Sequence, residues 1–353
     1  MSQSRNLQTY DLIVRGGEVA NHAGRGRADV GVRDGKIASI GDLSQASAGE
    51  EVDAAGLTVL PGVIDTQVHF REPGLEWKED LETGSRAAAL GGVTTVFEMP
   101  NTEPNTTDPH DDDGVRKVLS AVRRRATFHS EDEYRLAERR SLARPGDWTS
   151  HPEVRDAQSA IQSTERLVRL ARETGARIHV LHVSTAEEIV FLAGHKDVAT
   201  VEVTPQHLTL DGDAASPSGM PGVQTLVPVM LTHVAEGRMT LERFIDLTSA
   251  GAQRVFGIAG KGRMAEGYDA DLTLVDLKAK RKIRHEDMAS RCGWTPFDGF
   301  EATGWPMVTV VRGRVVMKDG ELLGQAHGRP VRFQETLGGV GTRDQGLWNS
   351  GAI

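Results

Sequence analysis

The chain has 353 residues, of which 38% are hydrophobic and 26% are charged, which excludes both a small peptide module and a disordered chain. Acidic residues outnumber basic ones by 50 to 41, for a net charge of −9, so we expect no nucleic-acid partner. The only cysteine, Cys292, excludes an intrachain disulfide, and no apolar run is long enough to span a membrane. We therefore expect a cytoplasmic protein with a small-molecule ligand.

The two ends of the chain are rich in predicted strands. Near the N-terminus, Asp34-Gly35 lies between alternating apolar positions, which is a strong signal for a hairpin. Asp319-Gly320 repeats this pattern near the other end. Because chain ends often lie close together, we predict one composite β-domain built from residues 1–57 and 259–333.

The middle of the chain, residues 58–258, alternates short apolar strands with amphipathic helices, predicted over residues 80–90, 114–125, 158–174 and 186–196. This alternation is typical of an α/β fold with a parallel sheet, and polar residues after each strand indicate a site at the carboxyl ends of the strands. No Gly-x-Gly-x-x-Gly segment opens a helix, which favours a (β/α)8 TIM-type barrel over a dinucleotide-binding sheet.

The middle region is too short for a complete barrel. Eight strand–helix units need roughly 250 residues, whereas this region has about 200 residues and five or six convincing strands. One element stops and another begins, without a complete unit between them, in residues 106–115 and 211–220. We therefore predict missing barrel segments near 108–112 and 212–216. Two explanations are open: the protein has residues at these places that are not among the 353, or it truly lacks them. We expect the first, because the loss of central units from a closed barrel would expose strand edges.

Three histidines, His69, His129 and His182, each follow a predicted strand and therefore converge on one end of the barrel. Imidazole nitrogen is a preferred ligand of zinc, so together they predict a metal site, although each alone would be interpreted as a hydrogen-bonded histidine. Asp65 and Gln67 share the strand face of His69. The nearby histidines are expected to be ordinary wall residues; they are His179 and His207.

Two further polar residues, Arg71 and Asn101, also lie at strand ends. An arginine with an amide can hold a substrate carboxylate through charge-assisted hydrogen bonds. The alternative for Arg71 is a salt bridge with Glu72 or Glu98. The basic run 123–125 is expected to be a solvated helix face, given the acidic total.

Several segments, in order along the chain, resemble the dihydroorotases of the cyclic amidohydrolase superfamily. They are DTQVHFREPG, EMPNT, FHSED, LHVS and TPFDG, and the likeness runs from about Tyr10 to Phe333. Allantoinases and hydantoinases share this frame, but EMPNT and REPG are more similar to dihydroorotase segments. The resemblance implies a (β/α)8 metal-dependent hydrolase barrel with a small β-sandwich built from both termini, in agreement with the predicted elements.

The resemblance also implies two divalent metal ions, usually zinc, bridged by a carboxylated lysine and a hydroxide. One ion would be held by a His-x-His pair on the first strand and a late aspartate, and the other by two histidines of middle strands. In this sequence the first pair falls on Gln67 and His69, and the second on His129 and His182. The positions that would bind the substrate carboxylate are Arg71 and Asn101.

This sequence departs from that pattern in three places. Gln67 replaces the first histidine of the His-x-His pair, and because an amide oxygen is a weaker zinc ligand than imidazole, the zinc site of this pair should be loose or empty. No lysine between Asn101 and His129 suits carboxylation, since Lys117 lies in a helical pattern among arginines. The late aspartate is also absent, so no catalytic residue is assigned. We expect one or two zinc ions per subunit.

These features predict a dihydroorotase of pyrimidine biosynthesis, a hydrolase that interconverts (S)-dihydroorotate and N-carbamoyl-L-aspartate by metal-activated hydroxide. The alternatives are an allantoinase or other cyclic amidase, and a non-catalytic homologue that binds a partner enzyme. We expect a homo-oligomer, with a dimer as the simplest form, and an enzyme of the same pathway is a candidate partner. The polar, glycine-rich residues 334–353 are expected to form a flexible tail.

Overall fold

Strands from both ends of the chain form one sheet. The computed structural model describes residues 9–99, 101, 103, 111–210 and 219–334. Its largest sheet has nine strands in the order β14-β13-β12-β11-β5-β1-β2-β3, with β4 paired to β1. The N-terminal strands are β1 (Thr9–Asn21), β2 (Gly24–Arg33), β3 (Lys36–Gly41), β4 (Ser47–Asp53) and β5 (Thr58–Pro61). The C-terminal strands are β11 (Leu272–Lys282), β12 (Glu301–Val311), β13 (Arg314–Lys318) and β14 (Glu321–Leu322).

Both predicted Asp-Gly hairpin turns are present. Asp34 and Gly35 have φ angles of 52° and 72°, and the flanking residues of β2 and β3 pair across the turn. Asp319 and Gly320 have φ angles of 52° and 85°, between the paired strands β13 and β14. Positive φ at both central residues is the type I′ geometry that matches the twist of a hairpin, and glycine adopts it without steric cost. The prediction is confirmed at both ends.

The nine-stranded sheet encloses an apolar core to which both ends contribute, with Leu12 and Val30 from one end and Leu272 and Val310 from the other. Strand β5, which we predicted as part of the barrel, pairs instead with β1 and β11 in this sheet. Its apolar sequence suits a buried strand of either sheet. The chain turns at Gly62, where an added Cβ would clash with the Thr94 side chain, and the barrel begins only after this turn.

The described residues contain five parallel strands in the region of the predicted barrel. Strand β6 (Val63–Val68) pairs with β7 (Val93–Glu98), and a separate sheet of order β10-β9-β8 contains β8 (Ala126–Phe128), β9 (Ile178–Val180) and β10 (Ala199–Val201). All of these pairs are parallel, as expected. The number of strands agrees with the five or six strands read from the sequence. The predicted gaps near 108–112 and 212–216 fall largely outside the described residues.

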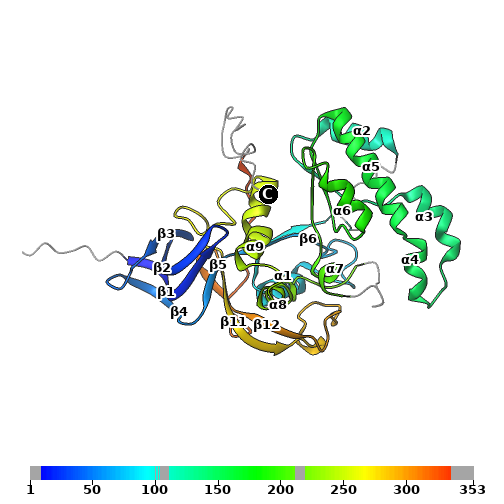
Figure 1. Cartoon of the computed structure of the whole chain (residues 1–353). Helices are drawn as coiled ribbons and strands as arrows, with labels where there is room; N and C mark the ends of the chain where they lie inside the picture. The colour runs from blue at the N-terminus through cyan, green and yellow to red at the C-terminus, as the bar shows by residue number, and fades with distance from the viewer. Residues whose placement is uncertain (1–8, 100, 102, 104–110, 211–218, 335–353) are drawn as a thin grey trace, which may run out of the picture.

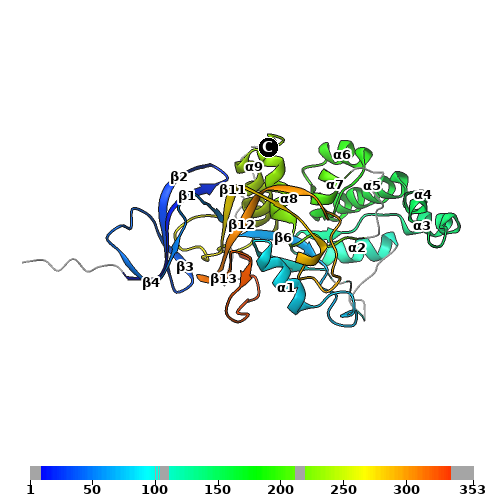
Figure 2. The same cartoon turned by 90° about the horizontal axis from the view of Figure 1, so that it is seen from below.

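The helices form two groups, each with its own apolar core. Beside β6 and β7 lie α1 (Leu81–Leu90), α8 (Leu226–Ala235), α9 (Leu241–Ile245), the π-helical turn η3 (Asp246–Ala250) and α10 (Gly251–Phe256). Beside β8–β10 lie α2 (Asp112–Ala121), α5 (Ala157–Thr174) and α6 (Ala186–Ala193). Farther from these strands, α3 (Glu133–Arg139) packs against α5 and against α4 (His151–Val154). The remaining short helices are η1 (Arg140–Leu142), η2 (Trp148–Ser150), α7 (Pro205–Thr209) and η4 (His285–Asp287). Figures 1 and 2 show α2–α6 as a lobe at the opposite end of the molecule from β1–β4. We call residues 111–203 the helical lobe.

Helix α2 ends earlier than predicted. Its C-cap residue, Val122, is extended with a ψ of 139°. Arg124 then lies over the ring of Phe333, 4.4 Å from its centroid, and Arg125 donates to the backbone carbonyl of Ile178 at 2.7 Å. The basic run that we expected to be a solvated helix face therefore lies outside the helix, because an aromatic ring and a strand carbonyl bind two of its guanidinium groups.

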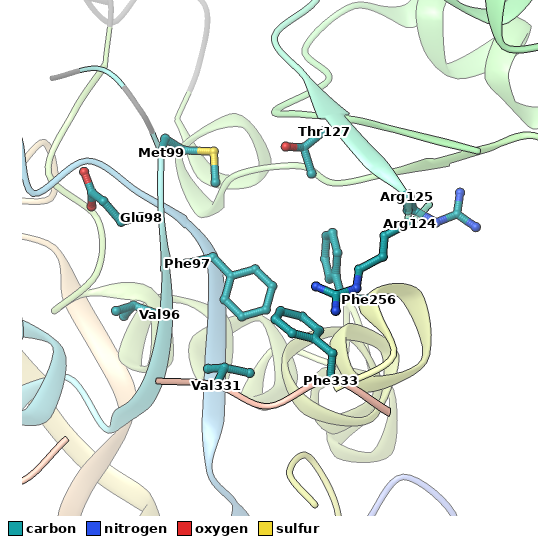
Figure 3. Close-up of a pocket in the computed structure, with 10 residues that line it drawn as sticks. All are labelled: Val96, Phe97, Glu98, Met99, Arg124, Arg125, Thr127, Phe256, Val331 and Phe333. Atoms are coloured by element: carbon teal, nitrogen blue, oxygen red, sulfur yellow. The ribbon is translucent and has the colours of Figure 1, made fainter. Parts of the chain in front are cut away.

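Side chains join the helical lobe to the rest of the barrel. Phe256 of α10 contacts Phe97 of β7 and His179 of β9 edge to face, with ring centroids 5.3 and 5.2 Å apart. Thr66 of β6 donates to Glu202, the residue after β10, at 2.8 Å. Next to the aromatic rings, a cavity of about 400 Å³ lies between β7 and β8, which do not pair with each other within the described residues (Figure 3).

The described chain ends against the barrel. Phe333 pairs with Ile258 through an isolated bridge, and the N–H of Ala259 donates to the carbonyl of Arg332 at 2.8 Å. The predicted flexible tail lies outside the described residues, apart from its first residue, Gln334. No helix in the described part of the chain is both long enough and apolar enough to cross a membrane.

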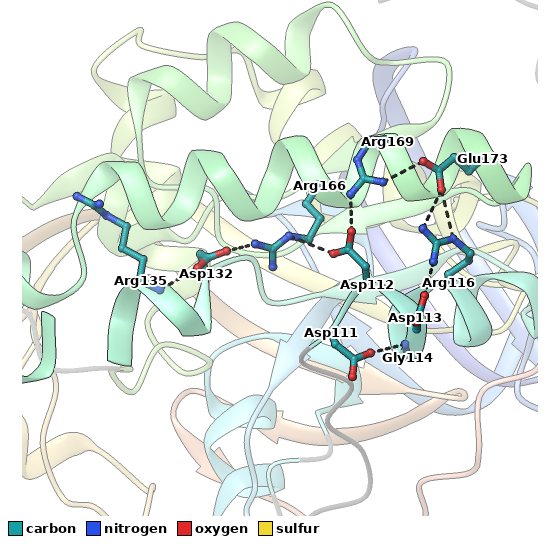
Figure 4. A network of polar contacts seen from close by, with 10 residues as sticks. All are labelled: Asp111, Asp112, Asp113, Gly114, Arg116, Asp132, Arg135, Arg166, Arg169 and Glu173. Carbon is teal, nitrogen blue, oxygen red and sulfur yellow. Dashed lines mark hydrogen bonds and ion pairs between the residues drawn. The ribbon is translucent and has the colours of Figure 1, made fainter. Parts of the chain in front are cut away.

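Ion pairs connect α2, α3 and α5 inside the helical lobe (Figure 4). Arg166 of α5 pairs with Asp112 and with Asp132, whose side chain is only 6% exposed. Asp132 also caps α3 by accepting from the N–H of Arg135 at 2.8 Å. Arg169, nearer the surface, pairs with Asp112 at 2.6 Å. The network holds the segment that follows β8 against α5.

We expect Arg166→Ala to lower the free energy of unfolding by about 2 kcal/mol, because it leaves the buried Asp132 carboxylate without its cation. Arg169→Ala removes a guanidinium that is 48% exposed and should cost less than about 1 kcal/mol. Urea unfolding of the two variants provides the comparison. Equal losses would contradict the view that Asp132 is the buried centre of the network.

Candidate active site

Two of the three predicted histidine ligands face each other at the carboxyl ends of adjacent strands. His129 follows β8 and His182 follows β9, and Nδ1 of His129 lies 2.9 Å from Nε2 of His182. The backbone of His182 has a φ angle of 37°, which a residue other than glycine rarely adopts. Such backbone strain is found most often at binding and catalytic sites.

The third predicted ligand, His69, directly follows β6 and lies close enough for the charges of His129 and His182 to act on it. Its Nδ1 atom is buried and has no hydrogen-bond partner among the described residues. Burial, and next the charge of Arg71, lowers the pKa of His69 to about 4. Burial, and next the charge of His129, lowers the pKa of His182 to about 4. Both rings are therefore neutral at neutral pH, which is the form that binds metals.

The histidine pair fits a metal ion. The two nitrogens lie at a hydrogen-bond distance of 2.9 Å. Two imidazole nitrogens on one tetrahedral zinc ion lie about 3.3 Å apart, so a small separation of the rings would let both contact one ion. The unpartnered Nδ1 of His69 is an additional buried nitrogen without a hydrogen bond. Within the described residues, no group of three or more His, Cys, Asp or Glu side chains is arranged to hold a metal. The described site thus contains two closely placed nitrogen donors and a third histidine beside them.

Glu131 and Arg155 support His129, and sequence reasoning missed both. Glu131 Oε2 lies 2.8 Å from Nε2 of His129, and Glu131 pairs with Arg155. A carboxylate on the far nitrogen of an imidazole fixes the orientation of the ring, and Arg155 also lies 3.3 Å from this nitrogen. The available signal was the FHSED segment, in which Glu131 follows His129 by two residues.

A polar cluster joins β6 to β10 near the histidines. Glu202 accepts from Thr66 and lies 3.1 Å from Nε2 of His179, while Nδ1 of His179 lies 2.8 Å from Thr200 Oγ1. Both ring nitrogens of His179 are thus occupied, as expected for a wall residue rather than a ligand. His207 lies exposed on α7, close enough for its charge to act on His182.

Removal from water, with a smaller contribution from the nearby Glu202 carboxylate, raises the pKa of Asp65 to about 7. The unfolded chain has a lower value, about 3.9, so the folded protein holds this proton more tightly. The resulting stabilisation is fully present below about pH 4 and is lost as the pH rises through about 7. Asp65 therefore destabilises the fold at alkaline pH.

We expect Asp65→Asn to raise the free energy of unfolding of the metal-free protein at pH 8 by about 2 kcal/mol. This is about half of what the full pKa difference would give, because the side chain is only partly buried. The amide oxygen can still accept from the N–H of Gln67, as the carboxylate does at 3.0 Å. Urea unfolding at pH 5 and pH 8 measures the effect, and an equal gain at both pH values would disprove it.

The structure places the other predicted site residues around His69. Gln67 lies half-buried on β6, two residues before His69. The alternative interpretation of Arg71, a salt bridge with Glu72 or Glu98, has no ion pair to support it in the part of the chain that the structure describes, and burial lowers the pKa of Arg71 despite the opposing charge of Glu98. The Asn101 side chain interacts with His69.

Comparison with known proteins identifies the family. Residues 58–213 and 219–316 match the model of the Amidohydrolase family. The chain belongs to the amidohydrolase family. This confirms the predicted family and the prediction of a hydrolase. A dihydroorotase from Methanothermobacter thermautotrophicus is 32% identical to this amidohydrolase over 405 aligned positions, which cover 86% of this chain and 94% of that protein. An allantoinase from Rubrobacter xylanophilus is 30% identical, with 94% of this chain and 100% of that protein covered.

Solved structures confirm the fold class of this amidohydrolase, a TIM-type barrel with a β-domain. An L-hydantoinase from Arthrobacter aurescens superposes with a TM-score of 0.80 at 25% identity, covering 90% of this chain and 98% of that one. A D-hydantoinase from Thermus sp. has a TM-score of 0.82 at 22% identity, with 89% and 97% covered. The 405 positions of the Methanothermobacter alignment exceed the 353 residues of this chain, so that relative has segments without a counterpart here.

Proposed function

We propose that this amidohydrolase opens and closes the ring amide of (S)-dihydroorotate, with N-carbamoyl-L-aspartate as the open form, in pyrimidine biosynthesis. The main support is the position of two histidine rings, with His129 Nδ1 2.9 Å from His182 Nε2. These two rings would hold a zinc ion. Relatives named dihydroorotase, 26–32% identical over 80–86% of the chain, support this substrate.

Zinc bound at this place would polarise the ring carbonyl and lower the pKa of a water molecule. Glu131 keeps the His129 ring oriented through its far nitrogen. Arg71 and Asn101 would bind the substrate carboxylate, since a guanidinium can donate two parallel hydrogen bonds to it. Hydrolysis breaks the ring C–N bond with one water molecule: the carbonyl carbon gains the hydroxyl as a carboxyl group, which ionises and releases a proton, and the nitrogen gains the other hydrogen. Ring closure is the reverse and takes up the proton.

Two other candidate functions have specific support. The Rubrobacter allantoinase aligns over 100% of its length, which favours a substrate without a carboxylate. Gln67 at the position of an expected histidine favours a non-catalytic homologue that binds a partner enzyme.

Turnover of dihydroorotate, allantoin and hydantoin by the zinc-supplied protein separates these candidates. We expect turnover of dihydroorotate. Turnover of allantoin alone would select the allantoinase, and zinc binding without turnover of any of the three would select the non-catalytic homologue.

Arg71→Gln should raise the KM for dihydroorotate about 10- to 100-fold, because it removes a charged hydrogen-bond donor from the substrate carboxylate. Arg86→Gln is the matched control, since this arginine lies exposed on α1 and pairs with Glu82. Initial rates over a range of substrate concentrations measure both variants. An unchanged KM in Arg71→Gln would show that Arg71 does not bind the carboxylate.

A further inference from the structure

A line of buried hydroxyl groups and one buried carboxylate connects the two histidine loops. Ser130, next to His129, is 4% exposed, Thr164 of α5 is 0% exposed and Glu188 of α6 is 2% exposed. Ser130 Oγ lies 2.7 Å from Thr164 Oγ1, which donates to Glu188 Oε1 at 2.7 Å. From the other side, Thr185 Oγ1 donates to Glu188 Oε2 at 2.9 Å. Thr185 follows His182 by three residues.

The direction of each hydrogen bond can be assigned. A carboxylate only accepts, so both threonine hydroxyls donate to Glu188. The single hydroxyl proton of Thr164 is therefore used, and Ser130 must donate to Thr164 Oγ1. Thr185 also accepts from the N–H of Glu188 at 3.3 Å and so caps α6. Removing one member would leave a buried polar atom of its neighbour without a partner.

Helix capping alone does not explain why the Glu188 side chain is buried. A glutamate at the third position of a helix can take part in a capping box while its side chain stays in water. Here the side chain is buried, has no ion-pair partner among the described residues, and reaches across to α5. Burial of such a group costs free energy unless hydrogen bonds compensate. Its second bond, through Thr164, leads to the loop that carries His129.

We propose that Glu188 is a positioning residue that holds the loops after β8 and β9 together, so that His129 Nδ1 stays opposite His182 Nε2. The inference rests on the proposed zinc-binding function. The N–H of Leu181 bonds to the carbonyl of Phe128 at 3.0 Å, at the point where β8 and β9 end and the two loops begin. Beyond this point Glu188 connects the two loops through side-chain hydrogen bonds, directly to Thr185 and by way of Thr164 to Ser130.

Zinc affinity, measured by competition with a chromophoric chelator on folded protein, tests the inference. Thr164→Val keeps the side-chain volume but removes the hydroxyl, and Glu188→Leu removes the carboxylate. Both should weaken zinc binding about 10- to 100-fold, the usual effect of losing a residue that orients a metal ligand. Glu188→Gln should stay closer to the native affinity, because its amide can accept from one threonine and donate to the other.

The matched control is Thr309→Val, since Thr309 is also 0% exposed and its hydroxyl donates to the carbonyl of Ala89 at 2.8 Å, outside the helical lobe. Its zinc affinity should stay within about twofold of native. If Thr164→Val binds zinc with native affinity while His182→Ala loses its zinc, the positioning role alone is overturned. Zinc affinity unchanged in His182→Ala would overturn the proposed metal site and the positioning role with it. Equal losses of zinc affinity in Thr164→Val and Thr309→Val would also overturn the positioning role, because both would then reflect a general loss of stability.

Discussion

His129→Ala and His182→Ala should each weaken zinc binding by more than about 100-fold, because residues that only orient a ligand already contribute about 10- to 100-fold. Each variant removes one nitrogen of the facing pair and leaves its partner as a single donor. Turnover should fall with zinc content. Elemental analysis of the dialysed proteins and chelator competition measure the effect.

His195→Ala is the control for these variants. His195 belongs to the same lobe, but its Nδ1 lies 2.7 Å from the carbonyl of Phe191 and its ring stacks on that side chain. Its removal should leave the zinc content unchanged. Native zinc content in both His129→Ala and His182→Ala would place the metal elsewhere in the protein.

Phe256→Ala should lower the free energy of unfolding by about 3 kcal/mol, at the lower end of the usual range because the ring is only partly buried. Phe256 contacts β7 and β9, which belong to two separate sheets with separate apolar cores. Loss of its ring removes the main aromatic connection between the helical lobe and the rest of the barrel. The lobe should then open at a lower free energy than the nine-stranded sheet.

Hydrogen exchange of α5 and β12 in Phe256→Ala tests this separation. Exchange in α5 should accelerate more than exchange in β12. Phe191→Ala is the control, because Phe191 packs within the helical lobe and stacks on His195 with ring centroids 4.1 Å apart. If Phe256→Ala accelerates exchange equally in both elements, the lobe is not a separate unit.

Local signals made several elements predictable. Helix α5 begins within one residue of its predicted start, because Asp156 caps it by accepting from Ser159, and it ends at Gly175, which has a φ angle of 68°. The meeting of His129 and His182 followed from the rule that parallel strands present their carboxyl ends on one side. The shortfall in barrel length stays a prediction from chain length.

Other features depend on contacts that no local pattern encodes. Strand β5 was placed in the wrong sheet because its apolar run suits either one. Arg155 follows Glu131 by 24 residues, and only the packing of the helical lobe brings them together. The connection made by Glu188 could not be predicted, because the sequence of its helix indicates only an ordinary capped N-terminus.

The most direct test of the site is a crystal structure of the zinc-loaded protein with anomalous diffraction recorded above the zinc absorption edge. The account predicts an anomalous peak in contact with both His129 Nδ1 and His182 Nε2. A peak at another place, or a zinc-saturated crystal with no peak between these two nitrogens, would contradict it.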